Sequence, residues 1–303
     1  MARKQQLKSD KIKVSETELA IARQKAMRAG KHFEVAQRMF CRFVRNDCGV
    51  RAEFSTKTQQ YNAVAHLPPP PPVIGLLVGD CVHNLRSALD HIVYALISTN
   101  PAKPEGVPDS RTMFPIRDTK EGYLHQVTKL RRIHGTPDAV AALIDSLQPY
   151  HSRDKGFDYT AHPLWVLDRL ENIDKHRRLM LASGVARHAH VSIRYTDGGE
   201  TDLLIMQDRI YDRAILTSYP PGADGKVQMD GYLMVYIALR EVDELPSFID
   251  EDIFRILAQL LDYVGNLVMP RFARLAAGHA TPPKKGRRQD FRPVLRGRRT
   301  GPR

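Results

Sequence analysis

The hydrophobic period of this chain changes along its length, and that change limits the folds open to it. Apolar residues recur at helical spacing in most segments. In contrast, residues 50–67 alternate in part between apolar and polar side chains, and residues 185–242 contain short β-type segments separated by turns. The segments predicted to be helical are 15–44, 74–98, 121–133, 137–147, 163–182 and about 251–276. We therefore predict an α+β fold in which long amphipathic helices are packed as a helical core with an inserted antiparallel β-meander.

The charge of the chain is concentrated at its two ends. The net charge is +12, and residues 1–13 together with residues 277–303 account for all of it. The last segment is also rich in proline, glycine and arginine and poor in apolar residues, a composition that cannot form a core. We predict a basic N-terminal arm (1–13), a single neutral α+β domain (14–276) with its β region at 185–242, and a disordered basic tail (277–303).

The basic tail is a candidate for binding phosphate. Clustered cations attract polyanions by releasing their counterions, without sequence preference. The residues predicted to attract phosphate are Lys284, Lys285, Arg287 and Arg288. RNA is therefore one expected partner, and a solvated tail that only increases solubility is the alternative.

Several classes of protein are excluded by what the sequence lacks. The most apolar stretch, residues 73–82, is interrupted by Asp80 and is too short to span a membrane. The chain has three cysteines with no C-x-x-C pair, and it contains no phosphate-binding or dinucleotide-binding glycine motif. His188 and His190 share one face of a predicted strand, but no third ligand accompanies them. We expect a cytoplasmic protein without membrane contact, metal or cofactor.

The helix predicted over residues 74–98 has an unusual polar face. Its apolar side is continuous, and the opposite side carries Asp80, His83, Asn84, Arg86, Ser87, Asp90, His91 and Tyr94. A solvated helix face normally uses lysine, glutamate and glutamine, which form helices better. Asp90 lies one turn from Arg86 and can pair with it. The face either carries chemistry or is a solvated surface with one local ion pair.

The helix predicted over residues 163–182 places charges in its apolar sector. Asp174 and Arg177 project there and can pair with each other, while Asn172 and His176 lie together on another face. Charged side chains are rarely buried without a partner. These residues form either a structural ion pair or part of a shared polar centre with the helix at 74–98.

Five short motifs resemble those of a group of uncharacterised bacterial proteins. The motifs are Gly79-Asp80, the Asn84–His91 string NLRSALDH, Phe114-Pro115-Ile116, Leu147-Gln148-Pro149-Tyr150 and the Asn172–Arg177 string NIDKHR. The resemblance spans roughly residues 73–182 and implies no established activity.

A more remote resemblance is to the HEPN superfamily, helical proteins common in toxin–antitoxin and phage-defence systems. Its signature is an arginine followed by four to six residues and a histidine on one helix, which Arg86 and His91 match. In catalytic members two such helices meet across a dimer and cut RNA without a metal. The resemblance implies a homodimer in which Arg86 binds phosphate and His91 transfers a proton.

Two functions of different kinds follow from these observations. The first is a HEPN-like RNA-binding protein of toxin or defence type, with Arg86 and His91 as catalytic residues if it is a metal-independent endoribonuclease. The supporting polar residues would be His83, Asn84, Asp90, Asn172, Asp174, His176 and Arg177. The second is a non-catalytic interaction or small-ligand-sensing protein whose polar helix face is structural. An enzyme of another class also remains open.

Overall fold

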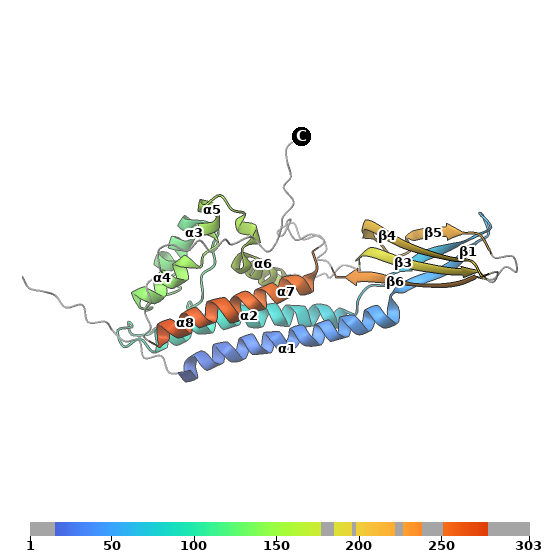
Figure 1. The fold of residues 1–303 in the computed structure, drawn as a ribbon. Helices are drawn as coiled ribbons and strands as arrows, with labels where there is room; N and C mark the ends of the chain where they lie inside the picture. Colours follow the sequence, from blue (N-terminus) through green and yellow to red (C-terminus); the bar gives the residue numbers. More distant parts are fainter. Residues whose placement is uncertain (1–15, 177–184, 196–197, 222–226, 238–250, 278–303) are drawn as a thin grey trace, which may run out of the picture. The chain divides into compact units, whose positions relative to one another are not determined.

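The computed structural model confirms the α+β fold class (Figure 1). It describes residues 16–176, 185–195, 198–221, 227–237 and 251–277. The predicted basic arm (1–13) and residues 278–303 of the predicted tail lie outside the described residues. No helix in the described part of the chain combines the length and the hydropathy that a membrane crossing needs.

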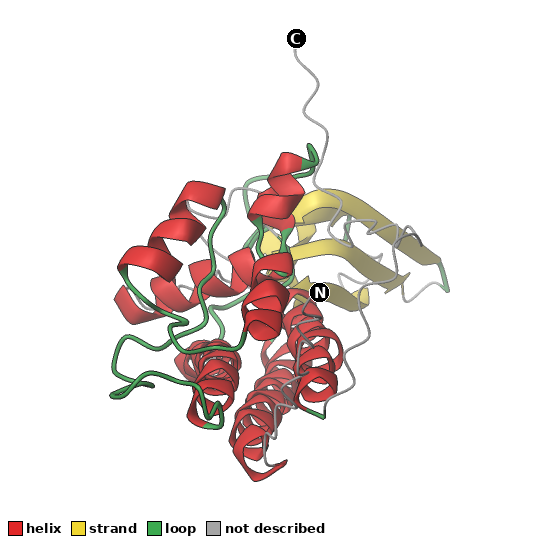
Figure 2. Cartoon of the chain, turned by 90° about the vertical axis from the view of Figure 1, so that its left-hand side faces the viewer, coloured by secondary structure: helices red, strands yellow, loops and turns green. Residues whose placement is uncertain are grey.

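The chain divides into two compact units. The first unit contains residues 1–30, 81–172 and 259–303, and the second contains residues 31–80 and 173–258. The regular elements described in the first unit are helical, whereas the strands belong to the second (Figure 2). The predicted 14–276 body thus includes residues of both units.

The helices occupy most of the predicted segments. The longer ones are α1 (Glu16–Asp47), α2 (Pro72–Ser98), α6 (Pro163–His176) and α7 (Ile253–Asp262), each with residues in both units. The shorter ones are α3 (Lys120–Leu124), α4 (Asp138–Ser146), α5 (Tyr150–Asp154) and α8 (Met269–Ala276). Single π-helical turns follow α3 at His125–Lys129 and α7 at Tyr263–Val268. Helix α5 and a short 3₁₀ turn, Tyr159–Ala161, were not predicted.

The core of the first unit is built on the apolar side of α2. Leu85, Leu89 and Leu96 of this helix are fully buried, as the continuous apolar side of the predicted helix requires. Phe114 and Phe272 are also fully buried, with their ring centroids 6.3 Å apart in an edge-to-face arrangement. The polar side of α2 is therefore held in place by a packed core behind it.

The strands of the second unit form two antiparallel sheets. The strands are β1 (Gly49–Ser55), β2 (Gln60–His66), β3 (Val185–Tyr195), β4 (Glu200–Ile210), β5 (Ile215–Tyr219) and β6 (Val227–Tyr236). In the described residues the sheet orders are β1-β2-β5 and β4-β3-β6. The inserted β region is thus more than a simple meander, because β5 pairs with β2 of the earlier hairpin and β6 pairs with β3.

The two sheets pack face to face through small and branched side chains. Ala65 and Leu67, from the end of β2, pack with Ala189 of β3 and Leu233 of β6. Gly231 lies where the sheets approach closely, because a Cβ at this position would stand 3.2 Å from Cβ of Val50 on β1 of the other sheet. The opposite face of sheet β4-β3-β6 is left to solvent.

Candidate functional site

An irregular segment, residues 113–117, runs through the interior of the first unit. Phe114 in this segment is fully buried and Ile116 is nearly so. A buried segment outside a helix or sheet has no regular partners for its peptide groups, and each unpaired group is costly. Side chains from other elements supply these partners, and they form the candidate site.

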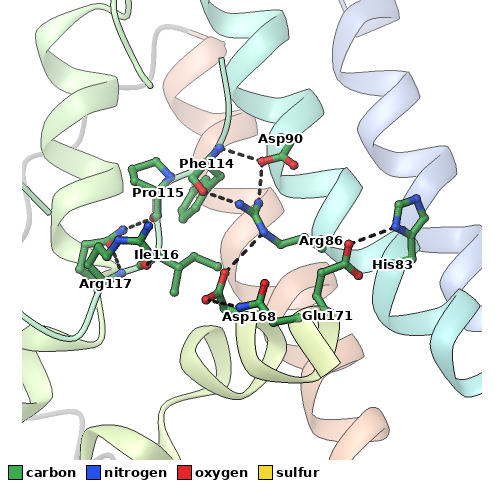
Figure 3. A network of polar contacts seen from close by, with 11 residues as sticks. His83, Arg86, Asp90, Phe114, Pro115, Ile116, Arg117, Asp168 and Glu171 are labelled. Atoms are coloured by element: carbon green, nitrogen blue, oxygen red, sulfur yellow. Dashed lines mark hydrogen bonds and ion pairs between the residues drawn. The ribbon is translucent and has the colours of Figure 1, made fainter. Parts of the chain in front are cut away.

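Arg86 and Asp90 of α2 hold the peptide groups of Phe114 (Figure 3). Arg86 Nη2 donates to the Phe114 carbonyl oxygen at 2.8 Å, and the Phe114 N–H donates to Asp90 Oδ1 at 2.8 Å. Arg86 Nη1 also donates to Asp90 Oδ1 at 2.6 Å, so the two side chains are joined. The ion pair predicted from their i,i+4 spacing is confirmed, and it also binds a third residue.

Gln148 holds the other half of the segment. Its Nε2 donates to the Pro115 carbonyl oxygen at 2.9 Å, and its Oε1 accepts from the Arg117 N–H at 3.0 Å. Gln148 is 1% exposed and lies two residues after the end of α4. Three motifs that lie far apart in the sequence therefore meet here: the Arg86–Asp90 pair, the Phe114 segment and Gln148.

Helix α6 adds a carboxylate beside Arg86. Asp168 Oδ1 lies 4.0 Å from Arg86 Nε, and Asn172 Nδ2 donates to Asp168 Oδ2 at 3.3 Å. Burial raises the pKa of Asp168, and the positive charges of Arg86, Arg117 and Arg169 oppose that rise. Asp168 is thus a carboxylate held in a poorly solvated place by neighbouring guanidinium groups.

A second acid of α6 contacts a histidine of α2. His83 Nδ1 lies 3.1 Å from Glu171 Oε1, and the Glu171 side chain is 4% exposed whereas that of His83 is 56% exposed (Figure 3). A buried carboxylate that orients a surface imidazole is the arrangement a general base uses. The chemical capacity of this pair is proton transfer at the protein surface.

His91 lies apart from this hydrogen-bonded cluster. It is half-buried, and it makes no hydrogen bond or ion pair within the part of the chain that is described. Residues five apart on a helix point about 140° away from each other. Arg86, in contrast, is 8% exposed and engaged by its neighbours. The structure therefore gives these two predicted catalytic residues different surroundings.

The remaining predicted site residues are only partly described. Asn84 is buried in α2, and among the described residues Asn172 contacts the cluster through Asp168. Asp174 belongs to the second unit, where its carboxylate packs against Gly79 of α2. The side chains of His176, Arg177, Lys284, Lys285, Arg287 and Arg288 lie outside the described residues.

Two acids of the cluster, Asp168 and Glu171, were not predicted. Both precede the residues of α6 that the sequence analysis selected, at positions where they resemble ordinary surface acids. The signal that could have found Asp168 is its i,i+4 spacing to Asn172. Nothing in the local pattern indicates that Glu171 is buried, because its burial depends on packing against α2.

Neither a metal centre nor a known relative identifies the chain. Within the described residues, no three histidine, cysteine, aspartate or glutamate side chains gather as metal ligands would. Compared with known proteins, the chain matches no protein-family model, no curated protein and no solved structure.

Proposed function

We propose that the chain is a non-catalytic interaction protein in which the polar face of α2 is structural. The proposal rests on the contacts that the Arg86 guanidinium makes with other groups of this chain. Its Nη1 binds Asp90, its Nη2 binds the Phe114 carbonyl oxygen, and its Nε faces Asp168. An arginine that binds a substrate phosphate directs its N–H groups at solvent, whereas Arg86 is 8% exposed and each of its three nitrogens faces a group of this chain.

The burial of the cluster supports the same proposal. Arg86 and Gln148 are buried, and the peptide groups that they bind belong to a segment with a fully buried phenylalanine. Breaking such contacts to admit a ligand would leave buried polar groups unpaired. A structural role, in contrast, requires none of these hydrogen bonds to break.

The charge distribution favours RNA as a second candidate partner. Residues 14–276 carry no net charge, and all of the +12 excess lies in the two terminal segments. RNA binding would then be sequence-independent and would weaken steeply as the salt concentration rises. Endoribonuclease activity through Arg86 and His91 stays a prediction of the HEPN resemblance.

One experiment tests these functions together. The purified full chain is incubated with a mixed RNA pool in EDTA, beside His91→Ala and a variant with Lys284, Lys285, Arg287 and Arg288 changed to glutamine. We expect intact RNA in every sample. The amount of RNA bound to the protein is measured in the same samples. Binding that is present in the wild-type chain and in His91→Ala, and lost in the glutamine variant, would show that the tail binds RNA. Cleavage by the wild-type chain that disappears in a folded His91→Ala variant would contradict the non-catalytic proposal.

A further inference from the structure

The solvent face of sheet β4-β3-β6 carries a compact set of apolar side chains. Buried Ala189, Val191 and Ile193 alternate along β3 with residues that point to the opposite face. On that face lie Leu204, Met206, His188, His190, Tyr232 and Met234, which we call the apolar face. Its four large apolar side chains are 58–69% exposed.

The strand register arranges the apolar face in two rows. His190 lies opposite Leu204 on one side and Tyr232 on the other, and the rings of His190 and Tyr232 stack with centroids 5.2 Å apart. His188 lies opposite Met206 and Met234 in the next row. Single exposed apolar residues are ordinary, but a contiguous exposed patch of this kind marks an interaction surface.

The two ends of the apolar face carry opposite charges. Beyond the Leu204 row, exposed Asp202 and Asp230 lie on either side of Ser192. Beyond the Met206 row, the guanidinium of exposed Arg187 lies over the ring of Tyr236, 5.0 Å from its centroid. One row beyond the two aspartates, Arg194 pairs with Glu200 at 2.7 Å, so this end keeps a net negative charge. The sequence of charges along the strands is therefore positive, apolar, net negative.

We propose that a second copy of this chain binds the apolar face. A two-fold axis relates the two copies; it lies between the two faces, runs perpendicular to the strands and passes midway between the two rows. This axis places the Met206 row of one copy on the Leu204 row of the other. It also places Arg187 of each copy over Asp202 and Asp230 of its partner. A face that is positive at one end and negative at the other is thus complementary to itself when its direction is reversed.

The size of the apolar face agrees with a dimer. Four large side chains that are mostly exposed, with the two half-buried histidines between them, offer on the order of 600 Å². Pairing two copies would bury about 1,200 Å², the lower end of the range for specific interfaces. The methionines can adapt their shape to the opposing row.

The proposal goes beyond the proposed function, because the apolar face belongs to the second unit and shares no residue with the Arg86 cluster. The test is sedimentation velocity of the full chain over a concentration series reaching about 100 μM. We expect the wild-type chain to form a dimer, and Met206→Glu and Tyr232→Glu to sediment as monomers with unchanged melting temperatures. The matched control is Ile215→Glu, because Ile215 is 59% exposed on β5 of the other sheet, and this variant should remain a dimer.

A mixing experiment tests the orientation. In a pair of Arg187→Glu chains, the new glutamate faces Asp202 and Asp230 at both ends, so negative charges meet. In a pair of Asp202→Lys/Asp230→Lys chains, Arg187 faces two lysines at both ends, so positive charges meet. Each variant alone should be monomeric, and an equimolar mixture should form a dimer, because both charge contacts are restored between the two variants. A monomeric wild-type chain would overturn the proposal, because the apolar face would then not bind a second copy of this chain. Dimers of Met206→Glu and Tyr232→Glu, or a mixture that stays monomeric, would also overturn it.

Discussion

Arg86 and Asp90 hold the two peptide groups of one residue, Phe114, from a single turn of α2. Arg86 binds the carbonyl oxygen and Asp90 binds the N–H, at 2.8 Å each, while the two side chains also bind each other. An arginine–aspartate pair thereby replaces the neighbouring strand that the segment lacks. The buried ring of Phe114 then packs edge-to-face on Phe272.

Removing the arginine should destabilise the fold strongly. Arg86→Ala leaves the Phe114 carbonyl oxygen unpaired and removes the cation beside Asp90 and Asp168, so we expect the free energy of unfolding to fall by about 2–4 kcal/mol. Urea unfolding measures the change. The control is Arg38→Ala, because Arg38 forms an exposed i,i+4 pair with Glu34 and its loss should cost less than about 0.5 kcal/mol. Equal losses in the two variants would contradict a structural role for Arg86.

Two helical glycines should respond to alanine in opposite directions. A Cβ at Gly79 would stand 2.8 Å from Cγ of Asp174, whereas a Cβ at Gly30 would meet nothing within 4 Å. We expect Gly79→Ala to destabilise the chain by up to about 2 kcal/mol, because the Asp174 carboxylate must shift and the higher helix propensity of alanine offsets part of that cost. Gly30→Ala should stabilise it by about 0.5–1 kcal/mol, because alanine favours the helix.

The contact with Asp174 can be isolated by a double-mutant cycle. Gly79→Ala should cost less in an Asp174→Ala background than in the wild-type chain, because the overlapping carboxylate is gone. Thermal unfolding of the four proteins measures the coupling. Costs that are equal in both backgrounds would show that Asp174 does not limit the space at Gly79.

Asp168→Asn should preserve or raise the melting temperature at neutral pH. Burial raises the pKa of Asp168 above its ordinary value, so ionisation of this carboxyl is less favourable in the folded chain than in the unfolded chain. The stability it contributes is present below its ordinary pKa of 3.8 and is lost as the pH rises through its folded pKa. Thermal unfolding at several pH values should show the advantage of Asp168→Asn disappearing in acid, and a large loss at neutral pH would contradict this prediction.

His162 should make the chain less stable in mild acid. Burial, followed by the charge of His151, lowers the pKa of His162 from 6.5 to about 4. Its Nδ1 accepts the Leu164 N–H at 3.2 Å, which requires an unprotonated nitrogen. Since the folded pKa is lowered, the stabilisation is present above pH 6.5 and is lost as the pH falls toward 4, by at most about 3 kcal/mol.

The matched variants for this pH dependence are His162→Asn and His125→Gln. Asparagine keeps an acceptor for the Leu164 N–H but does not titrate, so its urea unfolding should lose the dependence between pH 6.5 and about 4. His125 is exposed, and its replacement should leave the wild-type pH dependence unchanged. An unaltered pH profile in His162→Asn would contradict the assignment.

Local patterns predicted the helices and the strands because both depend on the period of nearby side chains. The buried leucines of α2 and the alternation along β3 follow directly from these periods. Helix α5 was missed because its five residues are too short for a period to be recognised. The pairing of β5 with β2 was also missed, because strand pairing joins residues more than a hundred positions apart.

The sequence by itself determined the fold class, the neutral body between basic ends, and the Arg86–Asp90 pair, which arises from one turn of helix. Only the tertiary structure decided what that pair does. Its attachment to Phe114, the approach of Asp168 and the burial of Glu171 all depend on packing between distant segments. Helical spacing fixes which side chains share a face, but desolvation and hydrogen-bond partners are set by whatever packs on that face.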